Sequence, residues 1–292
     1  MSSLLYMLST ILPINSSHAV PNMPNKFIYH FDRNIEFTNK DTIAIENLTM
    51  YNSMFNITQL KGNNRFTLTW NADTITSYDI VMEDQYLDVA QLASFMKKTC
   101  IDLGLFLIDA DGNALVYLDI NTISNLYDIE FISKPLPTEA ERISKGYSYP
   151  TNATWVCSTE SKNMQITLGN QFGEILGLTA GTYPIVSSNI NSSSRSTITP
   201  QVIKSNSILV GCNLVKNDMS EFSQILTGIP IDAGFGGTIA YIGASGSATN
   251  LSNITTKSLE ITFYDQFFAN LNMIDPNITL LLNLRKARVE LK

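Results

Sequence analysis

Ile278–Arg285 (ITLLLNLR) places Ile or Leu at every second position, and the intervening residues are more polar. Lys257–Gln266 (KSLEITFYDQ) shows the same alternation ahead of it. A period of two residues predicts two strands that each bury one face. Asp275-Pro276-Asn277 predicts the connection between them, because proline cannot donate a hydrogen bond to a strand ladder. A buried strand this late in the chain must pair with strands formed much earlier, as in Greek-key sandwiches.

Shorter strands are predicted along most of the remaining chain, from alternating or continuously apolar runs of strand length. Turn residues such as Gly62-Asn63-Asn64 separate some of these runs. The sequence therefore predicts an all-β fold. The runs are Lys26–Phe31, Thr42–Met50, Arg65–Trp70, Tyr78–Met82, Gln165–Leu168, Ser207–Val215 and Ile225–Ile231.

One amphipathic helix is predicted to begin at Val89. Asp88 is a good N-cap, and Gln91, three residues later, completes a capping box. Apolar residues then continue at helical spacing as far as Cys100. Beyond the helix, Asp109–Asn113 (DADGN) separates two apolar runs and predicts a hairpin turn. The position of its glycine and the lack of an acidic twelfth ligand do not fit a calcium loop.

The middle of the chain is interrupted by a polar, charged stretch between Pro137 and Pro150, which indicates an exposed excursion. We therefore expect residues 88–165 to form a mostly-β subdomain inserted into the main domain. A short helical turn that stops at Gly177 should lead back into the main domain. The expected fold is a single β-sandwich with this insertion and one or two short helices.

The composition excludes several classes of function. Charged residues make up 15% of the chain, against about 25% in ordinary soluble domains. The net charge of −7 disfavours specific nucleic-acid binding, which needs clustered Lys and Arg. The one dense basic group, Arg285-Lys286-Ala287-Arg288, is interpreted as a solvated chain end, and contact with packaged nucleic acid is the alternative. Three widely spaced cysteines predict buried, reduced thiols.

No catalytic, cofactor or metal site is predicted. The chain has two histidines, His18 and His30, and neither lies near a recognisable nucleophile or at ligand spacing from a cysteine. The glycine-rich stretch 234–246 lacks the Gly-Lys-Ser/Thr of a phosphate-binding loop. We therefore expect a protein that is not an enzyme and that needs no cofactor.

Residues 1–24 are predicted to form an N-terminal arm that packs on its own domain or on a neighbouring subunit. The apolar stretch is too short to span a bilayer. It has the length of a secretory signal but lacks a positively charged start, so an arm is favoured over a signal peptide. The candidate inter-subunit residues are Leu4, Leu5, Leu8, Ile11 and Leu12.

Five segments carry a resemblance to a known family. These are the ending ITFYDQ…DPNITLLLNLRK, the strands TIAIENLTMYNSMFNI and NNRFTLTW, the run SYDIVMEDQYLDVAQLASFM, and FGEILGL at Phe172–Leu178. In pattern and order they resemble the penton (minor capsid) proteins of virophages, Polinton-type elements and related double-jelly-roll viruses.

The resemblance implies a jelly-roll domain made of residues 25–87 and 166–292, with residues 88–165 as an outward insertion. It also implies a virion protein that is assembled in the host cell, forms homopentamers at the capsid vertices and contacts a major capsid protein of double-jelly-roll type. The insertion would be the part able to touch a host surface. The alternative is an extracellular or virion-surface β-rich binding or adhesion module, suggested by the signal-like start and by several Asn-x-Ser/Thr sequences.

Overall fold

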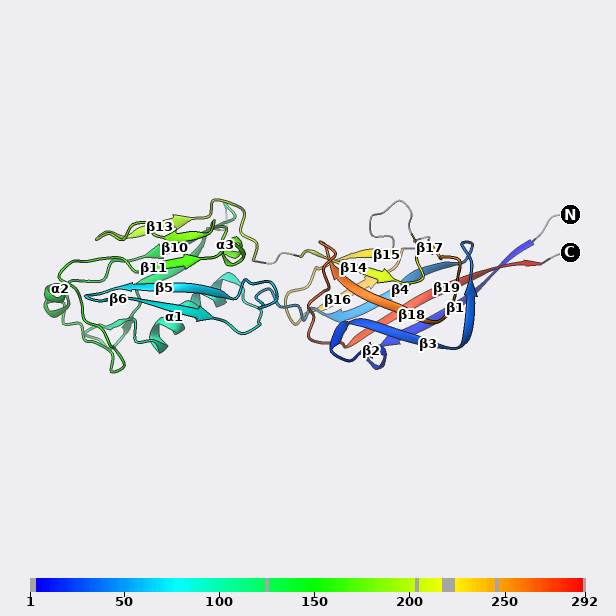
Figure 1. Ribbon diagram of the computed structural model, residues 1–292, viewed down its shortest axis with the longest axis horizontal. Coiled ribbons are helices and arrows are strands. Elements are labelled where there is room, and N and C mark those ends of the chain that lie inside the picture. Colours follow the sequence, from blue (N-terminus) through cyan, green and yellow to red (C-terminus); the bar gives the residue numbers. More distant parts are fainter. Residues whose placement is uncertain (1–3, 124–125, 203–204, 217–223, 245–246, 291–292) are drawn as a thin grey trace. The chain divides into compact units, whose positions relative to one another are not determined.

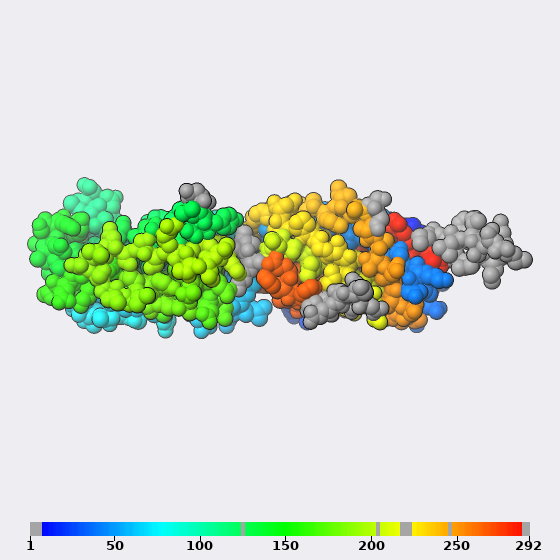
Figure 2. Space-filling view, turned by 90° about the horizontal axis from the view of Figure 1, so that it is seen from above, coloured from blue at the N-terminus to red at the C-terminus, as the bar shows by residue number. Residues whose placement is uncertain are grey.

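The computed structural model describes residues 4–123, 126–202, 205–216, 224–244 and 247–290. The chain forms two compact units, which we call unit 1 (residues 1–55 and 205–292) and unit 2 (residues 56–204). Figure 1 shows the strands of unit 1 in blue and in yellow to red, and those of unit 2 in cyan to green. In the space-filling view the continuous segment 56–204 likewise makes up one body, and the first and last segments together make up the other (Figure 2).

Unit 1 contains two antiparallel sheets. The first has the order β1-β19-β4-β16, and the short β17 also pairs with β4; the second has the order β15-β14-β18-β3-β2. The strands of the first sheet are β1 (Leu4–Asn15), β19 (Ile278–Glu290), β4 (Thr42–Tyr51), β16 (Thr238–Ile242) and β17 (Thr249–Asn250). Those of the second are β15 (Ile225–Pro230), β14 (Ser207–Cys212), β18 (Ile254–Asp265), β3 (Met23–Phe37) and β2 (Ala19–Val20).

The strand order identifies unit 1 as a jelly roll. Its main strands follow the chain as β1, β3, β4, β14, β15, β16, β18 and β19. One sheet takes the first, eighth, third and sixth of these strands, and the other takes the second, seventh, fourth and fifth. This interleaving of two Greek keys defines the jelly roll. The predicted all-β sandwich of jelly-roll type is therefore confirmed.

The inner faces of the two sheets form one hydrophobic core. The alternating residues of β18 and β19 are buried as predicted, and Phe263 of β18 meets the ring of Phe27 from β3 edge to face at 5.7 Å. The core contains side chains from both sheets, which makes unit 1 a sandwich. Asn283 is a buried polar residue of β19, and its side chain donates to the carboxylate of Glu46 and accepts from Ser9.

The N-terminal stretch was predicted to be an arm that packs on its own domain or on a neighbouring subunit, and part of it is a strand of unit 1. Residues 4–15 form β1, which pairs with β19 along its whole length, from Leu4 opposite Glu290 to Asn15 opposite Thr279. Leu12 and Ile14 are buried in the core of the same unit. The stretch is therefore an edge strand of the jelly roll, because its alternate apolar residues complete the core on that side.

Unit 2 is built from small antiparallel sheets and helices. One sheet has the order β12-β11-β5-β6, another the order β13-β10-β9, and β7 pairs with β8. The strands are β5 (Arg65–Asn71), β6 (Ile75–Val81), β7 (Leu107–Ile108), β8 (Ala114–Leu115), β9 (Leu118–Ile123), β10 (Asp128–Ser133), β11 (Gln165–Leu168), β12 (Gly181–Tyr183) and β13 (Ser192–Arg195). The helices are α1 (Val89–Asp102), α2 (Glu139–Ser144) and α3 (Asn170–Leu176).

The inserted unit is larger than the predicted 88–165. β5 and β6 were expected in the jelly roll, but β5 pairs with β11, so both belong to unit 2. Unit 2 also has its own core, in which the ring of Trp70 contacts Trp155 edge to face at 4.8 Å. The part of the chain that the structure describes holds three α-helices and one short 3₁₀ helix at Ser16–His18, against one or two helices expected.

Local predictions in unit 2 are confirmed. The carboxylate of Asp88 accepts from the N–H of Gln91, and the Gln91 side chain accepts from the N–H of Asp88, which is the predicted capping box of α1. Asp109 accepts from the N–H groups of Asp111 and Asn113, so that segment is a turn between β7 and β8. Within the described ranges, no helix combines the length and apolar character needed to cross a membrane.

Candidate functional site

The outer edge of β1 is one candidate surface for contact with another chain. β1 ends its sheet, and none of the described strands pairs with its second edge. Leu8 and Ile11 expose about half of their side-chain surface, at 52% and 48%, whereas Leu12 is buried in its own core. The side chains of Leu4 and Leu5 lie outside the described part of the chain. An open strand edge with exposed apolar residues can add a strand or pack against a partner.

The basic group near the C-terminus is largely used within unit 1. The Lys286 ammonium donates to the backbone oxygen of Glu36 at 2.7 Å and lies 5.4 Å from the centre of the Phe37 ring. The Arg285 side chain donates to Asn283. Both residues therefore have structural contacts, and the structure does not describe the side chain of Arg288.

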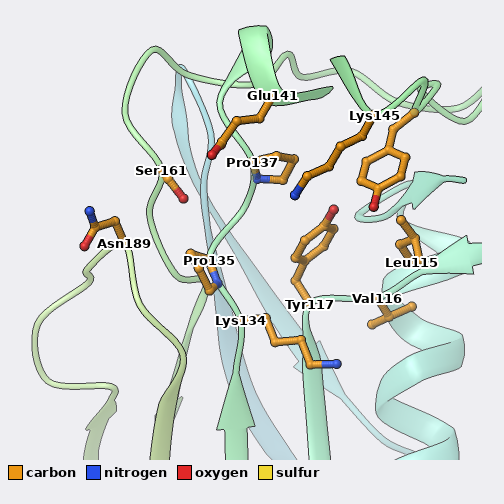
Figure 3. A pocket seen from close by; sticks show the side chains of 11 residues that line it. Leu115, Val116, Tyr117, Lys134, Pro135, Pro137, Glu141, Lys145, Ser161 and Asn189 are labelled. Atoms are coloured by element: carbon orange, nitrogen blue, oxygen red, sulfur yellow. The ribbon is translucent and has the colours of Figure 1, made fainter. Parts of the chain in front are cut away.

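A pocket of about 300 Å³ in unit 2 is the second candidate site (Figure 3). Four stretches that are separate in the sequence form its walls: the link from β8 to β9, the residues after β10, the α2 region, and two loop residues further on. The lining residues are Leu115, Val116, Tyr117, Lys134, Pro135, Pro137, Glu141, Lys145, Tyr147, Ser161 and Asn189.

The charged side chains of the pocket differ in their hydrogen-bond and ion-pair partners. Glu141 accepts from the N–H of Thr138 at 2.8 Å and from its hydroxyl, as the second half of the α2 capping box. These bonds from Thr138 hold the pKa of Glu141 below its usual value, so the carboxylate stays ionised. Lys134 and Lys145 take part in none of the ion pairs found among the described residues. The Lys145 ammonium lies 5.8 Å from the centre of the Tyr147 ring.

Tyr117 supplies the deepest polar group of the pocket. It is 8% exposed, and its ring meets Trp70 edge to face at 6.2 Å. Burial, followed by the nearby Cys157 and Tyr147, raises the pKa of the Tyr117 phenol, so it remains a hydrogen-bond donor. In Figure 3 the Tyr117 hydroxyl and the Lys145 ammonium both point into the pocket. The pocket thus offers a phenol donor and an ammonium group close together, with the ionised Glu141 also in its wall.

A hydrogen-bond network holds α2, which carries Glu141, against the rest of unit 2. The guanidinium of Arg142 donates twice to the carboxylate of Glu139, at 2.8 and 2.7 Å, and lies 4.4 Å over the Tyr149 ring. Tyr149 donates to Glu139 at 2.6 Å and accepts from the N–H of Cys157 at 2.7 Å. The bonds from Arg142, and then from Tyr149, lower the pKa of Glu139 to about 2.

This network predicts a pH dependence of stability. A carboxyl group whose pKa is lowered by folding stabilises the folded protein when the pH is above the pKa of the unfolded chain. That stabilisation is lost as the pH falls through the pKa of the folded protein. The unfolding free energy of unit 2 should therefore fall between about pH 4.5 and pH 2, and the Glu139→Gln variant should show a shallower fall. The measurement is urea unfolding at each pH, followed by tryptophan fluorescence. The matched control is Glu83→Gln, at an exposed position of unit 2; equal slopes in both variants would contradict the prediction.

The cysteines and His18 have structural surroundings in the described part of the chain. All three cysteines are free and buried, and burial raises the pKa of Cys100 and of Cys212 to about 12. His18 bonds to Asn15 and stacks on Tyr29 with the ring centres 5.3 Å apart. Where the structure describes the chain, no group of three His, Cys, Asp or Glu side chains is placed to hold a metal ion.

The pocket is not recognisable from the sequence. Pro135, Pro137 and Pro150 marked the region as an excursion, but nothing in that pattern links it to Tyr117 or Asn189. These residues meet only because β9 and β10 pair and the loop before β13 folds back beside them. The available signal was the unpaired lysines beside the prolines, which alone indicates only a solvated loop.

The chain was compared with protein-family models, curated proteins and solved structures. No protein-family model matches the chain, and no curated protein matches it. Among solved structures, the chain matches the crystal structure of the selenomethionine-labelled mavirus penton protein. The identity is 12%, the match covers 98% of this chain and 100% of that one, and the TM-score is 0.45. The assignment of unit 1 as a jelly roll rests on its own strand order.

Proposed function

We propose that the protein is a structural virion protein, a penton that forms homopentamers at the fivefold vertices of an icosahedral capsid. The observation that carries the proposal is the jelly-roll order of unit 1, interrupted once by unit 2. Jelly rolls are common in viral capsid proteins. Because a fold alone does not fix a function, the resemblance in sequence adds the penton assignment. Its segments lie in β4, β5, α1, α3, β18 and β19, which contribute to the cores of both units.

The proposed mechanism is geometric. Five jelly rolls close a ring, in which the free edge of β1 with Leu8 and Ile11 contacts a neighbouring subunit. The outside of the ring contacts a major capsid protein of double-jelly-roll type. Unit 2 then projects as the part able to meet a host surface. An exposed apolar edge strand favours permanent burial against a neighbour, since such an edge promotes aggregation when it is left free. The location expected under this proposal is the capsid vertex, after assembly in the host cell.

The first test is the native mass by light scattering, with electron-microscope class averages of the same peak. Five chains of 32.4 kDa give 5 × 32.4 = 162 kDa, and we expect a five-spoked ring at that mass. The double variant Leu8→Glu/Ile11→Glu should give monomers that retain the circular dichroism of the unchanged protein, because both side chains are half exposed. The control is Leu60→Glu, at an exposed position of unit 2.

Other outcomes separate the alternatives. A trimer would favour the adhesion module over the penton. A monomer that also fails to enter shells when mixed with a double-jelly-roll major capsid protein would overturn the proposal. A pentamer that survives Leu8→Glu/Ile11→Glu would keep the penton and remove β1 from its interface.

A further inference from the structure

We propose that the pocket in Figure 3 binds an acidic sugar, meaning a saccharide unit that carries a carboxylate or a sulfate group. The inference concerns unit 2 alone and does not depend on the oligomeric state. It rests on the size of the pocket, the surfaces of its walls, the balance of its charges and the rigidity of its frame.

The size and walls suit one saccharide unit. A volume of about 300 Å³ lies at the small end of the range for ligand pockets in proteins. Pro135 and Pro137 present apolar rings on one side, and Tyr117 and Tyr147 present aromatic rings on another. A pyranose has apolar C–H faces and polar edges, so it can pack its faces on these rings and turn its hydroxyls to the polar groups. Asn189 and Ser161 supply such groups at the rim.

The charges favour an anionic ligand. Lys134 and Lys145 line the pocket, and neither lies within ion-pair distance of a carboxylate among the described residues. Glu141, which is bonded to Thr138, is the one acidic residue of the lining, and the charge of Lys145 contributes to lowering its pKa. Two lysines and one glutamate give the lining one excess positive charge, in a chain whose net charge is −7. Figure 3 shows that the Lys145 ammonium is the one directed toward the Tyr117 hydroxyl. A carboxylate or sulfate near Lys145 would gain a charge-assisted hydrogen bond, and the Tyr117 hydroxyl can donate a second.

The frame of the pocket is rigid. The Arg142–Glu139–Tyr149 network fixes α2, and Tyr117 is held by its contact with Trp70. The buried Asn163 fixes the loop that carries Asn189, because its side chain bonds to Ser188 and Ile190 on either side. A preformed site loses little conformational entropy on binding, which favours recognition of a small ligand.

The experiment is isothermal titration of the full chain, with saturation-transfer NMR to identify the bound sugar. The probes are 3′-sialyllactose, lactose 6′-sulfate, lactose and sodium sulfate. The two acidic sugars should bind at least about tenfold more tightly than lactose, because only they reach the lysines with an anion. The affinities of the protein for these two acidic sugars show whether the pocket selects a carboxylate or a sulfate. Binding should weaken as the salt concentration rises.

Matched variants test the location. Lys145→Gln and Tyr117→Phe should each weaken binding of the acidic probe by about tenfold, since each removes one donor to an anion. Lys40→Gln makes the same charge change at an exposed position in unit 1 and should leave binding unchanged. Absence of binding by both acidic sugars would overturn the proposal, as would equal losses in Lys145→Gln and Lys40→Gln. Sulfate that binds as tightly as the sulfated sugar would show an anion site that does not recognise sugar.

Discussion

Asn163→Asp is expected to lower the unfolding free energy of unit 2 by about 3 kcal/mol or more, because it leaves several buried polar groups without partners. Asn163 is fully buried. Its amide nitrogen donates to the backbone oxygens of Ser133 at 3.0 Å and Ile190 at 2.8 Å. Its oxygen accepts from the N–H and the hydroxyl of Ser188, at 2.9 and 3.0 Å.

The substitution keeps the shape of the side chain but removes both donors. A carboxylate would instead face two carbonyl oxygens, and its charge would be buried without a cation. The loop 188–190 and the end of β10 would lose the residue that joins them, so the Asn189 wall of the pocket should loosen as well. We therefore expect weaker binding of the acidic sugar together with lower stability.

Tryptophan fluorescence reports this effect directly, because Trp70 and Trp155 are the two tryptophans of the chain and both belong to unit 2. The measurement is urea unfolding of the full chain followed by their emission. Asn189→Asp is the matched control, since it makes the same chemical change at an exposed position. Equal unfolding midpoints for the two variants would show that the bonds of Asn163 add little to stability.

Gly177→Ala is the second substitution with a large expected effect. Gly177 ends α3 in the left-handed region with φ of 69°, which suits glycine. A Cβ atom at this position would lie 2.4 Å from the backbone oxygen of Ile198 and 2.8 Å from the side chain of Ser196. The same segment is bonded to Gly177, whose oxygen accepts from the N–H groups of Thr197 and Ile198. The chain cannot move away without breaking these bonds.

Gly62→Ala separates the two causes. Gly62 has a φ of 65°, and a Cβ there would meet no atom within 4 Å. The Gly62→Ala variant should therefore lose only about 1 kcal/mol of unfolding free energy, from the cost of a positive φ for alanine. Gly177→Ala combines that loss with the clash, so we expect its unfolding free energy to fall by about 3 kcal/mol or more. The measurement is urea unfolding followed by tryptophan fluorescence. A similar loss in both variants would mean that residues 196–198 can shift away from the new Cβ atom at little energetic cost.

The features predicted correctly from sequence are those whose cause is local. The capping box of Asp88 and Gln91, the end of α3 at Gly177 and the alternation in β18 and β19 each depend on neighbouring residues. Short-range patterns determine caps and faces, and for this reason the sequence reveals them.

The boundaries of unit 2 and the place of β1 depend on pairing between distant residues. Arg65–Asn71 is correctly predicted as a strand, but its alternation does not show that its partner is β11 rather than a jelly-roll strand. Likewise, Leu12 and Ile14 look like part of a short apolar arm, and only their pairing with β19, more than 260 residues later, makes them core residues. Strand propensity says that a segment fits a sheet and leaves the partner open.

The chain passes from unit 1 to unit 2 and back, and each unit builds its core from its own segments of the sequence. All buried residues of one core come from residues 12–50 and 208–284, and all those of the other from 57–178. Each unit therefore buries its own set of residues. If the chain is the proposed penton, selection on what unit 2 recognises can proceed without changing any residue of the jelly-roll core.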